Sequence, residues 1–241
     1  MNIFPELKVS DIREDSVCWD VLVFGHLRWN RYFGETPENP PRGNPSTCGS
    51  VLIRGRDTGG KDYFLLVDPT TRRSREEYYF DLNRRTGLRP EAITHCFATH
   101  HHFDHWHGLK YFPNAKWFCG EGNKELIADA VKNSAGVDPG DGLSPEVEAG
   151  LLTEVCGEFL PGISAVPLPG HTQHLQGIGF FSEGKKILIA GDGVMTGYHF
   201  RDRLTEFQQD AALVKTAAET IENIAESFDI VLPGHDNLII L

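Results

Sequence analysis

Short runs of apolar residues, separated by polar or glycine-rich segments, recur along the whole chain. Runs of this length that are rich in branched and aromatic residues are typical of β-strands. Residues 63–68 are almost continuously apolar, which indicates a strand covered on both faces. The pattern predicts strands at residues 17–24, 50–53, 63–68, 93–98, 115–119, 151–155, 163–168, 175–181, 186–190 and 229–232.

Helical signals lie between these runs. Ser74 and Glu77 form a capping box, Gly87 can close the helix, and Pro90 stands beyond it. A second helix is expected after residue 119, where residues 126–131 carry an apolar face. A third and longer helix should begin near residue 210. Its apolar face is formed by Val214, Ala217, Ile221, Ile224, Ala225 and Phe228.

Clusters of strands occur in both halves of the chain, each accompanied by helices. This order predicts an α+β fold in which two β-sheets pack face to face and helices cover both outer faces. We find no low-complexity segment and no linker, so we expect one domain over residues 1–241.

Two long loops interrupt the pattern, at residues 34–47 and 133–150. The first holds four prolines and two glycines, and a loop of this length is more often a functional lid than a connector. Trp29 and Tyr32 lead into it and are candidate substrate contacts. The alternative is that these aromatic side chains pack beneath the loop.

Composition narrows the choice of partners. The 34 acidic residues exceed the 23 Lys and Arg, which gives a net charge of −11 and argues against nucleic acid or an anionic membrane. No apolar stretch is long enough to span a bilayer, and the N-terminus has no export signal. The five cysteines, an odd number without a close pair, suit a reducing compartment. We therefore expect a cytoplasmic protein that acts on a small molecule, with oligomeric state open and a homodimer as one option.

The strongest chemical signal follows the strand at residues 93–98. Five of the eleven histidines lie between His100 and His107, with Asp104 among them. In extended chain, side chains at i and i+2 point to the same side, so His100 and His102 can bind one ion together. If the chain turns there, Asp104 and His105 can face a second ion. Neutral imidazole and carboxylate are ligands of divalent cations, so the spacing predicts a metal site.

Three further metal-capable side chains stand directly after predicted strands. They are His171 in Pro-Gly-His-Thr, Asp192 in Ala-Gly-Asp, and His235 in Pro-Gly-His. Each follows a glycine, which permits a sharp turn or a close backbone approach. A single Gly-His turn is weak support for a site, but three such positions after the histidine cluster indicate one shared centre.

At this point the chain resembles the metallo-β-lactamase superfamily of αββα metallohydrolases. The resemblance spans roughly residues 52–235 and implies two mixed sheets between helices, with metals at one edge. The motifs that carry it are Leu66-Val67-Asp68, Thr99-His100-His101-His102-Phe103-Asp104-His105, Pro169-Gly170-His171-Thr172, Gly191-Asp192 and Pro233-Gly234-His235.

The resemblance implies two divalent metal ions and a role for each matching side chain. One ion would be held by His100, His102 and His171, the other by Asp104, His105 and His235, and Asp192 would bridge them. Asp68 would orient a ligand histidine. We expect zinc, with iron and manganese as alternatives, because His and Asp suit all three.

The implied chemistry is hydrolysis. Two cations about 3.5–4 Å apart lower the pKa of a bridging water and so create hydroxide near neutral pH. The hydroxide would attack a small ester, lactone or thioester, and Asp104 would act as a catalytic residue by passing the proton onward.

Size and motif spacing are most similar to the lactonase-like members. Those lactonases carry a tyrosine where this chain has Met195, and Tyr198 lies nearby. We count Trp106, Met195, Tyr198 and His199 as candidate substrate contacts, although Trp106 could equally begin the next helix. Replacing Tyr198 should change turnover more than metal content.

Three alternatives stay open. A persulfide dioxygenase of the same fold would hold a single iron through His100, His171 and Asp192. A phosphodiester hydrolase would use the same two ions. A metal-binding protein without turnover would keep the ligands alone.

Overall fold

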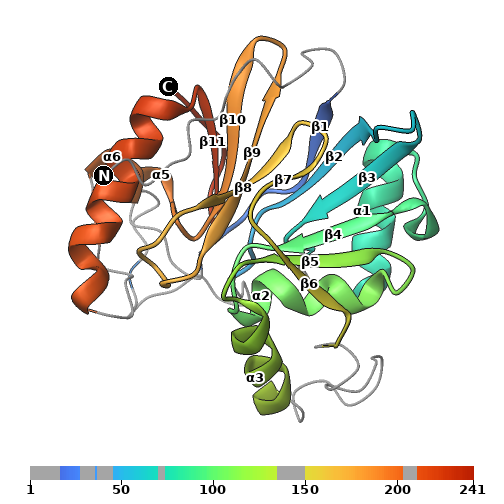
Figure 1. The fold of residues 1–241 in the computed structure, drawn as a ribbon, viewed down its shortest axis with the longest axis horizontal. Coiled ribbons are helices and arrows are strands. Elements are labelled where there is room, and N and C mark those ends of the chain that lie inside the picture. Colours follow the sequence, from blue (N-terminus) through green and yellow to red (C-terminus); the bar gives the residue numbers. More distant parts are fainter. Residues whose placement is uncertain (1–16, 28–35, 37–45, 70–73, 135–149, 203–210) are drawn as a thin grey trace.

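The structure is a computed structural model. It describes residues 17–27, 36, 46–69, 74–134, 150–202 and 211–241. The strands form two six-stranded sheets (Figure 1). The first sheet contains, in spatial order, β1 (Cys18–Val23), β2 (Ser50–Arg56), β3 (Asp62–Val67), β4 (His95–Ala98), β5 (Lys116–Gly120) and β6 (Leu152–Val155). The second contains β12 (Ile239–Ile240), β11 (Ile230–Pro233), β10 (Lys185–Gly191), β9 (Gln176–Ser182), β8 (Ile163–Pro167) and β7 (Gly157–Leu160).

Both sheets are mixed. In the first, β1, β2 and β3 are antiparallel, whereas β3 to β6 run parallel to one another. In the second, β10 and β11 are parallel and the other neighbouring pairs are antiparallel. Parallel neighbours end at the same edge of a sheet, so the loops that follow β4 and those that follow β10 and β11 each open at one sheet edge.

Helices cover the outer faces (Figure 1). In chain order the helices are α1 (Arg75–Thr86), η3 (Pro90–Ala92), α2 (Phe103–Trp106), η4 (His107–Tyr111), α3 (Lys124–Ser134), α5 (Gly197–Asp202), η5 (Ala211–Leu213) and α6 (Val214–Ser227). Of these, α1 and α3 lie against the first sheet and α6 against the second. This arrangement confirms the predicted pair of mixed sheets between helices.

The two-residue alternation of a strand sorts its side chains into separate cores. In β3, Leu65 and Val67 pack in the cluster between the two sheets, whereas Leu66 faces the helices and packs with Tyr78 and Leu82 of α1. All five side chains are buried. Because β3 is apolar on both faces, it fills two cores at once, as its continuous apolar run predicts.

The signals that predicted α1 operate as expected. The Ser74 hydroxyl accepts a hydrogen bond from the Glu77 amide at 3.2 Å. Gly87 ends the helix in the left-handed conformation at φ 74°, and its amide donates to the Asn83 carbonyl. Three short elements, β7, β12 and α5, were not predicted. Among the described residues, no helix is both long enough and apolar enough to cross a membrane.

Candidate metal centre

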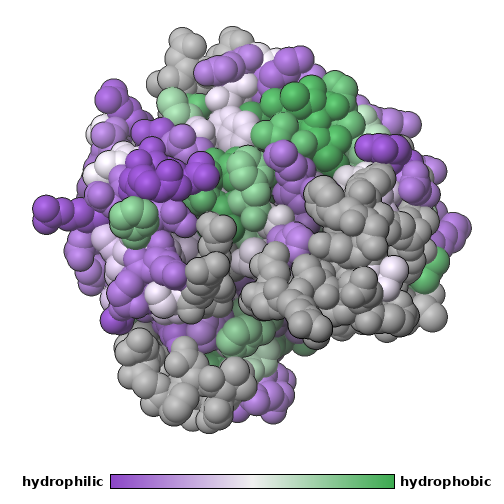
Figure 2. Space-filling view, turned by 180° about the vertical axis from the view of Figure 1, so that it is seen from behind, coloured by the Kyte–Doolittle hydropathy of each residue, from purple (hydrophilic) through white to green (hydrophobic). Residues whose placement is uncertain are grey.

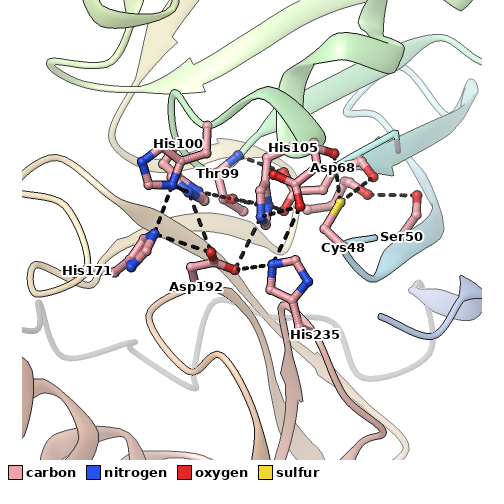
Figure 3. Close-up of polar contacts among 12 residues, drawn as sticks. Cys48, Ser50, Asp68, Thr99, His100, His105, His171, Asp192 and His235 are labelled. Atoms are coloured by element: carbon pink, nitrogen blue, oxygen red, sulfur yellow. Dashed lines mark hydrogen bonds and ion pairs between the residues drawn. The ribbon is translucent and has the colours of Figure 1, made fainter. Parts of the chain in front are cut away.

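Loops at the ends of four strands meet where the two sheets adjoin, and their side chains point toward one another (Figure 3). From the first sheet, the segment after β4 supplies His100 and His102, and the single-turn helix α2 supplies Asp104 and His105. From the second sheet come the three remaining predicted ligands, His171 after β8, Asp192 after β10 and His235 after β11. The structure therefore brings all seven predicted ligand side chains together.

The first cluster contains three imidazoles and one carboxylate. His102 Nδ1 lies 2.9 Å from both His100 Nε2 and His171 Nε2. Asp192 Oδ2 lies 3.3 Å from His171 Nε2 and 3.8 Å from His100 Nε2. The four donor atoms lie within 4.8 Å of one another, a spacing that allows them to share one ion.

The second cluster uses the other oxygen of the same aspartate. Asp192 Oδ1 lies 3.2 Å from His105 Nε2 and 3.2 Å from His235 Nε2. Asp104 Oδ2 lies 3.5 Å from His235 Nε2 and 3.9 Å from His105 Nε2. The resemblance implied the first set and placed Asp104 with His105 and His235; here His105, Asp192 and His235 form one group of donor atoms, and Asp104 forms another with Cys48 and His105.

Neighbouring groups fix the orientation of these rings. Asp68 Oδ2 lies 2.7 Å from His105 Nδ1 and accepts a hydrogen bond from the Thr99 hydroxyl at 2.8 Å. Asp68 Oδ1 accepts from the Thr99 amide. On the opposite side, the Thr47 carbonyl lies 3.0 Å from His235 Nδ1. With Nδ1 bonded outward in this way, His105 and His235 turn Nε2 toward the cluster.

Burial and neighbouring charges set the protonation of the cluster. Burial lowers the pKa of His102 to about 4, and the neighbouring His171 adds to this effect. Burial likewise holds the pKa of His100 well below its usual value. Burial alone would raise the pKa of Asp192, but His235 and His105 hold it well below its usual range. His100 and His102 are thus neutral and Asp192 is ionised, which are the forms that bind metal.

Two buried atoms indicate that the donor set fits a cation. His105 Nε2 and Asp192 Oδ1 have no hydrogen-bond partner among the described residues, although both are shielded from solvent and face each other. A buried polar atom without a partner is costly, and a divalent ion would satisfy both. The His and Asp donors also suit zinc, iron or manganese.

The predicted substrate contacts have different surroundings. Trp106 packs in the core beneath the helices of the first sheet, and its indole donates to the His101 carbonyl at 2.9 Å. Tyr198 and His199 are buried in α5, and Met195 lies in the segment between Asp192 and that helix. Contact of Trp106, Met195, Tyr198 or His199 with substrate stays a prediction. Trp29 and Tyr32 lie outside the described residues, as do most of the 34–47 and 133–150 loops.

Sequence reasoning missed Cys48 and Thr47. Cys48 is fully buried, and its sulfur lies within 4.8 Å of donor atoms of Asp104 and His105. No motif marks either residue, because Thr47 acts through its main-chain carbonyl and Cys48 comes near the centre only through the fold.

The family model described as "Metallo-beta-lactamase superfamily" matches residues 43–235, which is well over half of the chain. No curated protein matches.

Solved structures share the fold at low sequence identity. A structure named for a metallo-beta-lactamase from Thermotoga maritima is 16% identical with a TM-score of 0.64, over 94% of this chain and 100% of that chain. A quorum-quenching N-acyl homoserine lactone lactonase is 17% identical with a TM-score of 0.62, over 94% of both chains. The hydrolase AbOPH is 17% identical with a TM-score of 0.61, over 98% of this chain and 91% of that chain.

The family match covers strands β2 to β11 and every predicted ligand, and members of the family are largely metal-dependent hydrolases. The fold, the converging histidines and aspartates, and the family match agree with one another. This chain belongs to the metallo-beta-lactamase superfamily.

Proposed function

We propose that this protein is a dinuclear metallohydrolase that cleaves a lactone, ester or thioester of a small molecule. The observation that carries the proposal is the position of the Asp192 carboxylate between the two clusters. Its Oδ2 faces His100 and His171, whereas its Oδ1 lies 3.2 Å from both His105 and His235. A carboxylate with one oxygen directed at each of two imidazole clusters is suited to bridge two cations.

A pair of divalent cations, when bound, supplies Lewis acidity and lowers the pKa of water to near neutrality. The side chains of the protein provide the metal ligands and a route for the proton. Burial keeps His100 and His102 neutral, so they are ready to bind without losing a proton. The Asp104 side chain is 29% exposed, unlike the buried Asp192, so Asp104 can take up a proton at the site and release it to solvent.

The substrate class rests on similarity and on charge. Structures of the same fold include N-acyl homoserine lactone lactonases and the hydrolase AbOPH, which makes esters and lactones the first compounds to test. The net charge of −11 disfavours long-range attraction of nucleic acid. All five cysteines are free, which fits a cytoplasmic location.

The experiment measures metal content and hydrolysis together. Protein purified without added metal should contain about two ions per chain by mass spectrometry of the metals. It should hydrolyse at least one member of a panel of lactones, esters, thioesters and phosphodiesters. A chelator should abolish this activity, and zinc, manganese or iron should restore it.

Substitutions of the proposed ligands test whether the activity depends on this metal centre. His171→Ala and Asp192→Asn should lower metal content and activity together, because they remove a donor of one cluster and the shared carboxylate. His95→Phe is the matched control, since His95 lies at the start of β4 and stacks on Phe118. A single oxygen-sensitive iron would favour the dioxygenase. Two bound ions without turnover of any substrate would favour a binding protein, and turnover of the phosphodiesters alone would favour a phosphodiesterase.

A further inference from the structure

The segment Thr47-Cys48-Gly49, directly before β2, contacts the second cluster at two ligands. The Thr47 carbonyl lies 3.0 Å from His235 Nδ1, and the Gly49 amide donates to the Gly234 carbonyl at 2.6 Å. The Cys48 thiol donates to the main-chain carbonyl of Asp104 at 2.9 Å. These three consecutive residues thus contact one proposed ligand from each sheet, Asp104 from the first and His235 from the second.

The segment is itself held in place. Thr47 and His26 exchange two main-chain hydrogen bonds, of 2.8 and 2.9 Å, which join the segment to the chain after β1. A Cβ on Gly49 would lie 3.3 Å from the Pro233 carbonyl, a tight contact that a side chain could make only if its neighbour moved by a few tenths of an ångström. Cys48 is therefore presented to Asp104 from a fixed backbone rather than from a free loop end.

Asp104 needs such support because of where it lies. It belongs to α2, a helix of only four residues, and a single turn is not stable by itself. Its side chain is the most exposed of the carboxylates in the two clusters. The thiol reaches the main chain of Asp104 and also lies 3.9 Å from the Asp68 carbonyl, so it contacts the backbones of two residues that flank His105 in space.

We infer that Cys48 is a positioning residue for the second metal ion, an inference that rests on the proposed dinuclear site. The thiol holds the Asp104 backbone so that the carboxylate stays opposite His235 and His105. The second cluster has four donors without sulfur, namely Asp104, His105, His235 and the shared Asp192, so an ion there does not need the sulfur as a ligand. The sulfur is accordingly assigned as a hydrogen-bond donor to the Asp104 carbonyl.

The test compares Cys48→Ala, Cys48→Val and Cys48→Ser with wild type. Each protein is freed of metal and titrated with Co²⁺ and with Zn²⁺ against a competing chelator, and the two binding steps are resolved. Ala and Val cannot donate to the Asp104 carbonyl, so the second step should weaken about 10-fold or more while the first is unchanged. Ser retains a donor and should recover most of the lost affinity. Val better fills the space left by sulfur and serves if the Ala variant does not fold.

Cys119→Ala is the matched control, because Cys119 is an equally buried free cysteine in β5. It should bind both ions as wild type does. Unchanged second-step affinity in folded Cys48→Ala or Cys48→Val overturns the inference. Sulfur-to-cobalt charge-transfer absorption in wild type that is lost in Cys48→Ser also overturns it, since the sulfur would then be a ligand. A wild type that binds only one ion overturns the dinuclear proposal itself, and so the two failures are distinguishable.

Discussion

Asp68 shows how a residue that is not a ligand controls the centre. Its backbone adopts a positive φ of 46°, and its amide donates to the Phe97 carbonyl. One carboxylate oxygen accepts a hydrogen bond from the Thr99 amide. The other accepts from the Thr99 hydroxyl and lies within hydrogen-bond distance of His105 Nδ1. Two oxygens thus fix the start of the histidine segment and the orientation of one ligand ring, a task that requires a full carboxylate.

Asp68→Asn should weaken metal binding by about 10- to 100-fold without unfolding the protein. Asparagine tolerates positive φ, but its single acceptor oxygen cannot accept from the Thr99 amide, the Thr99 hydroxyl and His105 Nδ1 all at once. Chelator competition with Zn²⁺ measures the change. Asp229→Asn, which alters a carboxylate bonded to the Lys186 amide, should leave the affinity unchanged. Equal affinities for the Asp68 variant and wild type would show that His105 is oriented by other contacts.

His95 gives the protein a stability that depends on pH. Its ring stacks on Phe118 at 5.7 Å between centroids, and burial, reinforced by Lys116, lowers its pKa from 6.5 to about 4. Between these pH values the unfolded chain binds a proton that the folded protein does not, so stability falls as the pH falls from 6.5 toward 4. The ring is only partly buried, which limits the effect to about 1–2 kcal/mol.

Urea unfolding of metal-free protein at pH 7.5 and pH 5.0 measures this effect. Wild type should lose more stability on acidification than His95→Phe, which has no titrating group at this position. The other histidines are common to both proteins, so their contributions cancel in the comparison. The same loss in both proteins would mean that His95 titrates as it does in the unfolded chain.

Single residues also show where sequence reasoning stops. His100, His102, Asp104 and His105 were predictable because few other tasks explain so many metal-capable side chains in one short segment. Cys48 was not, since it lies 56 residues from Asp104 in the sequence and reaches it only in the folded chain. Trp106 was a candidate substrate contact or the start of the next helix; its ring is buried in the core of the first sheet, and its contact with substrate stays a prediction.

At the scale of elements, strand ends bring the site together. Gly191 at the end of β10 pairs with Pro233 at the end of β11, and the Gly234 amide donates to the Gly191 carbonyl at 2.8 Å. Parallel strands place their following loops at the same edge, which brings Asp192 beside His235. The strands and the α1 caps were predictable from local patterns. The short β7, β12 and α5 were not, because pairing and packing rather than local sequence define elements of this size.

Gly234→Ala should disrupt the second cluster. A Cβ at this position would lie 2.1 Å from Asp192 Oδ1 and 3.0 Å from the Gly191 carbonyl, so either the shared carboxylate or the turn has to move. We expect loss of the second ion and about 1–3 kcal/mol of destabilisation. Metal analysis and thermal unfolding measure both. Gly150→Ala is the control, because no described residue beyond its chain neighbours lies within 4 Å of an added Cβ. Two ions retained in Gly234→Ala would show that the turn relaxes freely.

At the scale of the whole molecule, the two sheets pack against each other across one buried interface. Figure 2 shows purple, hydrophilic residues over much of one face of the surface, beside green, apolar areas. The core between the sheets includes Leu65 and Phe97 from the first sheet and Ile178 and Ile187 from the second. The site lies where this interface reaches the strand ends, and each cluster takes donors from both sheets. The order of strands and helices predicted the layers, but the distances between the clusters required the packed structure.

Because each ion would connect the two sheets, metal should stabilise the whole fold. With free metal at about 100 times the dissociation constant, one site contributes about 2.7 kcal/mol, and two sites contribute about twice that. For a chain of this length, each kcal/mol raises the melting temperature by about 2–4 °C. Differential scanning calorimetry should therefore show a single transition that rises by about 10–20 °C between chelated and metal-saturated protein.

His171→Ala separates stabilisation by bridging ions from general effects of added salt. The variant lacks a donor from the second sheet in the first cluster, whereas the second cluster keeps all of its donors. Its metal-dependent rise should be about half that of wild type, because one ion still connects the sheets. A full rise in the variant would mean that the first cluster does not hold an ion in the folded protein. A rise confined to one of two separate transitions would mean that the sheets unfold independently and that the ions do not join them.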